Sequence, residues 1–180
     1  MADFNKILQP GDFQNGLVNT VVEIPKGSAN KIEWQRDKRI FKIDRVEPTI
    51  FAKPANYGFI PGTLDEDGDE LDSLVVTDEP ISTGVWVEMR VIGVLNFEDD
   101  GENDHKIIGV VADDRQTGDA VNSLNDLTSG FKNQIEHHFS HYKDLKKPGS
   151  TKVLGWGDVE AAKKIIEESI KRFQDKPASA

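Results

Sequence analysis

Residues 64–76 read L-D-E-D-G-D-E-L-D-S-L-V-V, an acidic stretch that runs directly into an apolar one. Every position from Asp65 to Asp72 except Gly68 and Leu71 carries a carboxylate. Like charges this close together resist ionisation unless a positive charge lies among them. Carboxylate oxygens are the ligands that hard divalent cations prefer. A metal-binding loop would answer this need, but an acidic loop taken alone is more often a solvated turn, so the rest of the chain has to decide between the two.

The spacing of three aspartates favours the metal-binding interpretation. In an extended chain Asp67 and Asp69 point to one side and Asp72 to the other. Gly68 permits a turn or a positive φ, and a bend before Asp72 would bring the three carboxylates to one site. The apolar residues that follow predict a buried strand. An EF-hand is excluded, because with Gly68 at the sixth loop position Leu74 stands where that motif needs Glu.

Composition places limits on the class of protein. The 180 residues predict a single domain over 1–180, with 175–180 as a frayed tail. The formal net charge of −10 argues against a nucleic-acid partner, and the absence of cysteine excludes disulfides and thiolate metal sites. The N-terminus shows no signal-peptide pattern, and no apolar run is long enough to span a membrane. We expect a cytoplasmic protein with no membrane partner.

The first two-thirds of the chain has the pattern of β-structure. Residues 17–24 and 106–113 each predict a strand, and 31–36 with 39–46 predict a hairpin. Residues 85–97 predict a long strand with a bulge at Gly93. Residues 49–61, which are rich in aromatic residues, proline and glycine, predict an ordered loop. Regular turns between strands indicate a small barrel or sandwich.

The last third changes to helical periodicity. Phe131, Ile135, Phe139 and Tyr142 fall on one helical face, and Thr128 or Ser129 can cap the helix. A second helix follows, for which Gly157 or Asp158 is the predicted cap; its apolar face comprises Ala162, Ile165, Ile166, Ile170 and Phe173. The fold class is therefore mainly β with helices (α+β).

A second acidic loop, 98–104, would face the first across the mouth of such a barrel. Divalent ions held close together by carboxylates are a common device for phosphoryl chemistry, and that chemistry also needs cations for the substrate. The basic candidates are Lys31, Arg45, Lys106 and Lys143, each of which could instead be an ordinary surface charge. Tyr57 and Tyr142 could equally be packing residues.

A histidine cluster, His137, His138 and His141, resembles the zinc motif H-E-x-x-H. Its second position is His rather than Glu, and Glu136 lies at the wrong helical angle to serve as the base. We therefore favour a histidine face, which is a candidate for a subunit contact, over a zinc site.

Taken together, the motifs resemble those of the soluble family I inorganic pyrophosphatases of bacterial type. The signature is D-G-D-E-L-D at 67–72. Six further segments appear in family order and extend the resemblance over about residues 17–173: V-V-E-I-P-K-G-S (21–28) with N-K-I-E-W (30–34), I-D-R (43–45), P-A-N-Y-G-F-I-P (54–61), I-G-V-L (92–95), D-x-x-x-x-D-x-K (99–106) and H-Y-K-D-L (141–145). One short acidic motif alone would be weak, but the ordered set is specific.

The resemblance implies a five-stranded OB-like closed β-barrel flanked by two C-terminal helices. It also implies hydrolysis of pyrophosphate with several Mg²⁺ ions, Mn²⁺ being a possible substitute, and assembly as a homohexamer. Asp69 would be the general base, with Tyr57 as a further catalytic group, and Glu33 would lie behind the metal ligands. The implied metal ligands are Asp67, Asp72, Asp99, Asp104 and Glu23, with Asp72 bridging two ions; the implied phosphate-binding residues are Lys31, Arg45, Tyr57, Lys106, Tyr142 and Lys143.

The chain departs from the family pattern at Lys53, where an aromatic residue, often Tyr, is usual. This departure leaves the effect of Lys53 open but does not touch the predicted metal site. Two rival functions remain at the level of sequence. One is a non-catalytic cation-binding barrel, and the other is a two-metal phosphatase or nuclease that acts on an organic phosphate.

Overall fold

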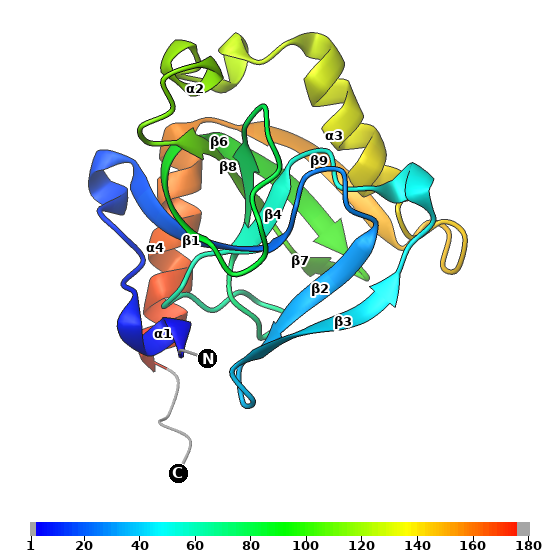
Figure 1. Ribbon diagram of the computed structural model, residues 1–180, viewed down its shortest axis with the longest axis horizontal. Helices are drawn as coiled ribbons and strands as arrows, with labels where there is room; N and C mark the ends of the chain where they lie inside the picture. Colours follow the sequence, from blue (N-terminus) through cyan, green and yellow to red (C-terminus); the bar gives the residue numbers. More distant parts are fainter. Residues whose placement is uncertain (1–2, 176–180) are drawn as a thin grey trace.

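The computed structural model describes residues 3–175. Strands dominate the first two-thirds of the chain and helices the last third (Figure 1). In chain order the elements are α1 (Phe4–Ile7), η1 (Phe13–Asn15), β1 (Leu17–Ile24), β2 (Asn30–Gln35), β3 (Ile40–Val46), η2 (Thr49–Phe51), β4 (Asn56–Phe59), β5 (Asp72–Val76), β6 (Trp86–Asp99), β7 (Glu102–Asn103), β8 (Lys106–Val111), α2 (Thr117–Ala120), η3 (Leu124–Asp126), α3 (Ser129–His141), β9 (Thr151–Gly157) and α4 (Val159–Asp175).

Five strands form a closed barrel in the order β1-β4-β5-β8-β6, which the pairing of β6 with β1 completes. β5 and β8 are parallel, and the other neighbours in the barrel are antiparallel. β9 and the short β7 extend the sheet from the far half of β6. Helices α3 and α4 lie against the barrel (Figure 1). The predicted OB-like closed barrel with two C-terminal helices is therefore confirmed.

The long strand β6 bends at Gly93, where the register with β8 shifts. Gly93 has φ +156°, and a Cβ there would lie 2.6 Å from the carbonyl oxygen of Gly157. The glycine therefore lets β9 approach closely while β6 turns from one side of the barrel to the other. The bulge predicted at this position is confirmed.

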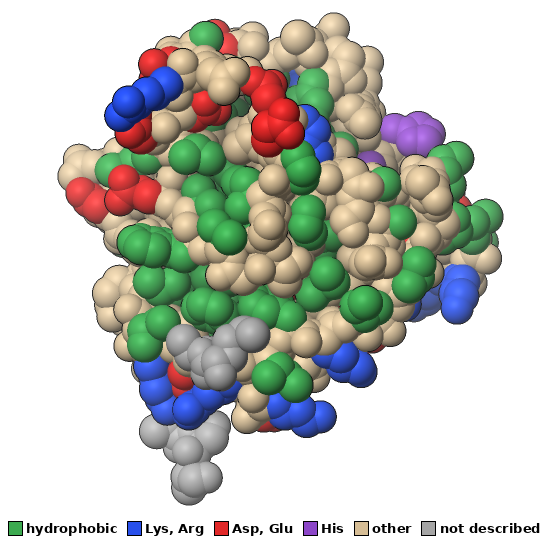
Figure 2. All heavy atoms as spheres, viewed as in Figure 1, with side chains coloured by type: hydrophobic (Ala, Val, Ile, Leu, Met, Phe, Trp, Pro, Cys, Tyr) green, Lys and Arg blue, Asp and Glu red, His purple; other side chains and the backbone are tan. Residues whose placement is uncertain are grey.

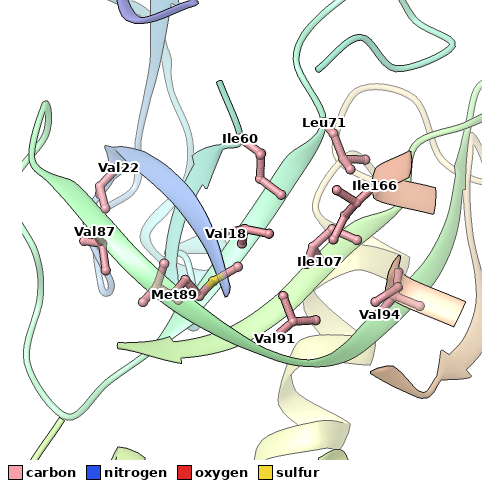
Figure 3. Close-up of a cluster of buried hydrophobic side chains, with 12 residues drawn as sticks. Val18, Val22, Ile60, Leu71, Val87, Met89, Val91, Val94, Ile107 and Ile166 are labelled. Carbon is pink, nitrogen blue, oxygen red and sulfur yellow. The ribbon is translucent and has the colours of Figure 1, made fainter. Parts of the chain in front are cut away.

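Successive side chains of the barrel strands pack into two different apolar clusters, as the two-residue period of a strand requires. Val75 and Ile107 join a cluster covered by Ala162 and Ile166 of α4 (Figure 3). Their neighbours Leu74 and Ile108 join a second cluster, which α3 covers with Ile135 and Phe139. This alternation explains why β5 and β8 read as continuous apolar runs: both of their faces are buried.

Both C-terminal helices begin where the sequence predicts. The Thr128 hydroxyl accepts a hydrogen bond from the amide of Phe131 (3.2 Å) at the start of α3. An Asp158 carboxylate oxygen accepts one from the amide of Ala161 (2.9 Å) at the start of α4. These contacts satisfy amides that a helix leaves without partners in its first turn.

The prediction of a loop over 49–61 is wrong in part, because β4 lies within it. This strand of four residues pairs with β1 on one side and with β5 on the other. Gly58 suits that position, since a Cβ there would lie 2.1 Å from the carbonyl oxygen of Val21. Strand β9 and the short helices α1 and α2 are also absent from the sequence prediction. Residues 176–180 of the predicted tail lie outside the described residues, and no helix in 3–175 is long and apolar enough to cross a membrane.

Candidate active site

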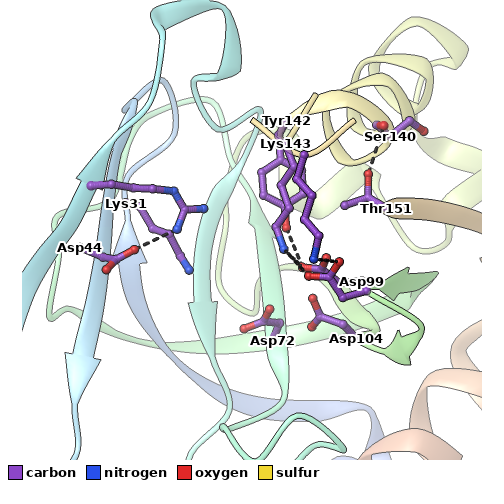
Figure 4. Close-up of polar contacts among 12 residues, drawn as sticks. Lys31, Asp44, Asp72, Asp99, Asp104, Ser140, Tyr142, Lys143 and Thr151 are labelled. Carbon is purple, nitrogen blue, oxygen red and sulfur yellow. Dashed lines mark hydrogen bonds and ion pairs between the residues drawn. The ribbon is translucent and has the colours of Figure 1, made fainter. Parts of the chain in front are cut away.

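Every residue that the sequence assigns to the site lines one cleft of about 240 Å³. The β2–β3 hairpin forms one wall, and the end of α3 forms the opposite wall (Figures 1 and 4). The aspartates come from the loop before β5, from the first residue of β5 and from the two ends of the β6–β8 connection, while the glutamates Glu23 and Glu33 come from β1 and β2. The lining residues predicted from sequence are Glu23, Lys31, Glu33, Arg45, Tyr57, Asp67, Asp69, Asp72, Asp99, Asp104, Lys106, Tyr142 and Lys143.

The acidic loop is folded so that its carboxylates point in different directions. Gly68 has φ +92°, as its predicted role in a turn requires, and the amide of Asp69 donates to a carboxylate oxygen of Asp67 (3.0 Å). Asp65 and Glu70 are buried, whereas Asp67 and Asp69 are exposed at the mouth of the cleft. Asp65 lies outside the lining of the cleft, and Glu70 lies in it, so the buried carboxylates hold the loop in place while the exposed ones are open to a ligand.

The two buried carboxylates bind basic side chains of other elements. Asp65 accepts from Arg172 of α4 (3.2 Å). Glu70 accepts from Arg36, which follows β2 (2.8 Å), and from Asn5 of α1 (2.5 Å). Arg36 also lies 3.9 Å from Asp69, so the loop is tied to three elements that are distant in sequence. The sequence analysis did not assign these anchoring roles, because the partners lie far away along the chain.

Lys106 lies between two carboxylates, so its ammonium group is not free to bind an anion. Its side chain is buried, and Nζ donates to Asp72 (2.5 Å) and to Asp104. Burial alone would lower the pKa of Lys106, but Asp72 and Asp104 together raise it above its ordinary value. The Tyr57 hydroxyl also donates to Asp72. Lys106 was predicted to contact phosphate, and here it neutralises two of the predicted metal ligands.

A second cationic group meets Asp99 from the end of α3 (Figure 4). The Tyr142 hydroxyl donates to Asp99 Oδ2 (3.1 Å), and Lys143 forms an ion pair with the same oxygen. The other oxygen, Oδ1, is buried, and no group of residues 3–175 forms a hydrogen bond with it. A buried carboxylate oxygen without a donor is costly, so this oxygen is suited to a ligand that supplies positive charge.

The hairpin wall carries the remaining predicted residues. Lys31 and Arg45 are cross-strand partners, and each is paired with acidic groups of the same hairpin. Lys31 lies 2.6 Å from Glu33, and Arg45 is paired with Asp44 (2.9 Å) and with Glu47. Glu33 therefore contacts a cation of the cleft, and its charge also helps to raise the pKa of Glu23, one of the predicted metal ligands.

Glu23 has the most perturbed carboxyl group in the cleft. Burial raises its pKa to about 8; a hydrogen bond from the Trp34 amide (2.6 Å) opposes this shift, and the charges of Asp72 and Glu70 add to it. A group with this pKa is protonated at neutral pH unless a cation favours its ionised form. The carboxyl group of Glu23 would therefore ionise when a cation binds beside it.

The cleft contains residues that the sequence analysis did not assign to it. Lys53 lies among the rings of Tyr57 and Tyr142, with Nζ 3.4 Å from Nε2 of His138. The predicted histidine face is therefore split, since His138 is buried while His137 and His141 are exposed and have ring centroids 4.6 Å apart. The other lining residues that were not predicted are Trp34, Gln35, Phe59, Glu70 and Phe139.

The donor set fits a hard divalent cation chemically. Within residues 3–175 no three acidic, histidine or cysteine side chains stand ready around one ion, because Lys106 and Lys143 lie between the carboxylates. The aspartates that line the cleft nevertheless offer carboxylate oxygens as metal ligands, and the buried Oδ1 of Asp99 is among these oxygens. Such a set favours Mg²⁺, Mn²⁺ or Ca²⁺ over softer metals.

The family model for inorganic pyrophosphatase matches residues 20–174. An inorganic pyrophosphatase of Haemophilus influenzae is 63% identical over 176 residues, which cover 98% of this chain and 100% of that protein. The crystal structure of an inorganic pyrophosphatase from Neisseria gonorrhoeae has a TM-score of 0.94 and 61% identity, covering 96% of this chain and 100% of that one. The Thermus thermophilus inorganic pyrophosphatase structure has a TM-score of 0.88 at 43% identity, with coverage of 96% and 99%. With its barrel, its acidic cleft and these similarities over nearly its whole length, the chain belongs to the inorganic pyrophosphatase family.

Proposed function

We propose that this chain hydrolyses pyrophosphate to two phosphates in a Mg²⁺-dependent reaction. The observation that carries the proposal is the division of one cleft into two chemical sides. Asp72, Asp99 and Asp104 gather at the barrel, and Lys31, Tyr142 and Lys143 lie on the walls around them (Figure 4). Asp67 and Asp69 of the acidic loop and Arg45 of the hairpin line the same cleft. A metal-loaded carboxylate floor beneath cationic walls would suit a small, highly charged anion.

The ions would be held by Asp67, Asp72, Asp99, Asp104 and Glu23. Bound Mg²⁺ would polarise the phosphate oxygens and lower the pKa of an attacking water. Mn²⁺ prefers the same hard oxygen ligands and is the proposed substitute. Lys106 would then exchange at least part of its contact with Asp72 and Asp104 for a phosphate oxygen, since a divalent ion supplies the positive charge that the lysine now provides.

Asp69 is the proposed general base. It lies at the mouth of the cleft, where it is exposed to water, and no hydrogen bond in the described residues occupies its carboxylate. Partial desolvation, Asp67 and Glu70 raise its pKa, which improves its match to a base that works near neutral pH. Asp69 would accept the proton of the attacking water as the new phosphorus–oxygen bond forms. The bond from that phosphorus to the bridging oxygen breaks, and the second phosphate leaves.

The remaining groups would bind the substrate. Lys31, Arg45 and Lys143 provide charge to the phosphate oxygens, and Tyr57 and Tyr142 can donate from their hydroxyls. Burial and the nearby Asp72 raise the pKa of Tyr57 well above its ordinary value, so this phenol keeps its proton. Donors fixed in place before the substrate arrives stabilise developing charge with little reorganisation.

The test is phosphate release from pyrophosphate with Mg²⁺, with excess chelator, and with the Asp69→Asn variant. We expect the chelator to abolish release and Asp69→Asn to lower kcat by about two to four orders of magnitude, the usual contribution of a general base. Glu66→Gln, an exposed carboxylate of the same loop outside the cleft, is the matched control and should keep its activity. Normal turnover by Asp69→Asn would remove Asp69 from the role of base.

A substrate panel separates this function from its rivals. Release from organic phosphates or nucleic acid at rates similar to pyrophosphate would favour a broader two-metal hydrolase. Stabilisation by Mg²⁺ without any phosphate release would favour a non-catalytic cation-binding barrel.

We further propose that the chain works in the cytoplasm as a homohexamer. Large apolar side chains remain exposed on a single chain, among them Ile43, Val46 and Ile50 on and after β3. Apolar side chains also gather across the middle of the face shown in Figure 2. Contiguous exposed apolar surface is typical of sites that other chains cover.

A further inference from the structure

The cations of the cleft differ in how their charge is balanced. Lys31, Arg45, Lys106 and Lys143 each have a carboxylate partner within hydrogen-bonding or ion-pair distance. Lys53 lines the same cleft, yet within residues 3–175 no carboxylate lies within 4.0 Å of its Nζ. It is therefore the one basic group of this cleft whose charge no acidic side chain of the described chain neutralises.

Aromatic faces and a histidine surround this ammonium group instead. Its Nζ lies 4.6 Å from the ring centroid of Tyr57, 5.1 Å from that of Tyr142 and 5.4 Å from that of Phe139. These are cation–π distances, and such contacts favour the charged form of the lysine. Nε2 of His138 lies 3.4 Å from the same nitrogen.

His138 is suited to accept a hydrogen bond from Lys53. Burial lowers the pKa of His138 to about 3, and the charge of Lys53 adds to the effect, so the imidazole is neutral. One ring nitrogen of a neutral imidazole accepts, and Nε2 faces the ammonium. The neutral ring, stacked on Tyr142 with centroids 5.6 Å apart, therefore holds Lys53 without cancelling its charge.

The backbone holds Lys53 in place as well. Its amide donates to the carbonyl of Ser28 (3.0 Å), and its carbonyl accepts from the amide of Gly27 (2.9 Å). Pro54 follows directly and limits the backbone conformation of Lys53. The backbone of Lys53 is thus fixed between the β1–β2 connection and β4, which limits where its ammonium group can lie.

Lys53 also faces the phosphate-binding wall. A small side pocket shares Lys31, Arg45, Lys53 and Tyr142 with the lining of the cleft, and the acidic residue in its own lining is Glu47, the partner of Arg45. We propose that Lys53 is a further substrate-binding residue, whose ammonium group contacts the phosphate on the Lys31–Arg45 side of the cleft. His138 is its positioning residue. This inference rests on the proposed pyrophosphate hydrolysis.

The energetics agree with an anion as the missing partner. Burial, with the neighbouring charge of Lys106, lowers the pKa of Lys53 to about 7, while Asp72 opposes the shift and Lys31 and Arg45 add to it. A partly desolvated cation is unfavourable until an opposite charge joins it. A phosphate group would supply that charge and restore the full protonation of Lys53.

The experiment measures binding separately from turnover. Methylenediphosphonate, a pyrophosphate analogue without a bridging oxygen, is titrated calorimetrically into the full chain with Mg²⁺. Lys53→Met, which removes the charge at similar length, should weaken binding about tenfold or more, the usual range for a lost charged hydrogen bond. Lys53→Arg should recover part of the loss, His138→Phe should weaken binding less than Lys53→Met, and KM should rise more than kcat falls. Lys171→Met, the same charge change on the exposed face of α4, is the matched control.

A second measurement uses the unaltered protein and so does not depend on how a variant folds. Reductive methylation by formaldehyde and borane is followed at Lys53 by peptide mass spectrometry, and methylenediphosphonate should protect Lys53 while leaving Lys171 reactive. Equal diphosphonate affinity in Lys53→Met, or equal labelling with and without the analogue, would overturn the inference. If the unaltered chain neither binds the analogue nor releases phosphate, the proposed function itself fails, and the role of Lys53 fails with it.

Discussion

Glu23 shows how one residue of the cleft depends on its neighbours. Burial holds its pKa at about 8, so at neutral pH in the absence of a cation the carboxyl group carries a proton. A metal ion that binds there must displace this proton. At the scale of a single residue, the protonation state in the cleft is therefore set first by burial and then by neighbouring charges, and not by residue type alone.

This environment predicts a pH-dependent metal affinity. Because the raised pKa favours the protonated acid below about pH 8, Mg²⁺ affinity should rise with pH up to that value and level off above it. One displaced proton gives roughly a tenfold change per pH unit below the pKa. Titration calorimetry with Mg²⁺ between about pH 6 and pH 9 checks the expectation. Glu23→Gln should show a flatter dependence, and an affinity that is constant over this range in the unaltered protein would contradict it.

At the scale of elements, α4 is more than a cover for the barrel. Arg172 near its end donates to the Asp65 carboxylate (3.2 Å) and to the carbonyl of Leu64, while the Leu64 amide donates to the carbonyl of Ser169 (3.0 Å). The helix thereby holds the start of the acidic loop, whose later residues face the cleft. Asp65 is almost fully buried, so its carboxylate depends on this contact.

Arg172→Met should therefore destabilise the protein. The substitution keeps most of the aliphatic packing but removes the cationic partner of the Asp65 carboxylate, which then keeps only the Glu66 amide as a donor, and it removes the side-chain donor to the Leu64 carbonyl, at a cost of about 1–3 kcal/mol. Urea unfolding followed by circular dichroism measures the change. Lys171→Met, one position away and exposed, is the control and should stay within about 0.5 kcal/mol of the unaltered protein. An unchanged free energy of unfolding in Arg172→Met would show that the helix does not hold the loop through this pair.

The sequence predicts some of the strands and helices well and misses others. Strands β1, β6 and β8 and helices α3 and α4 agree with the prediction to within about two residues at most ends, because each has a clear period or cap. β4 has neither, since its four residues include Gly58 and follow a proline-rich stretch. Its extended form comes from pairing between β1 and β5, which local sequence does not encode.

At the scale of the whole molecule, the net charge of −10 has the same sign as the charge of the proposed substrate. A strongly negative protein repels a small anion at long range. The basic side chains on the walls of the cleft offset this repulsion locally. Divalent ions bound by the aspartates would offset it further, which agrees with a reaction that depends on metal.

Assembly can be tested at the same scale. We expect size-exclusion chromatography with light scattering to give roughly 120 kDa, six copies of the 20.1 kDa chain. Ile43→Lys, which places a charge on an apolar position of β3 that is 53% exposed, should shift the mass towards smaller species if β3 lies in a subunit contact. A single species near the mass of one chain for the unaltered protein would contradict the hexamer.

The sequence by itself determined the class of fold and the acidic loop, which rest on period and spacing. It also determined part of the lining of the cleft, through motifs that resemble those of the family; all of these are local properties of the chain. Only the tertiary structure decided which carboxylates face the cleft and which anchor the loop, that Lys106 lies between Asp72 and Asp104, and that Lys53 meets His138 across 85 positions of sequence. These contacts join segments far apart in the chain, so their charge balance and their pKa values exist only once the barrel has closed.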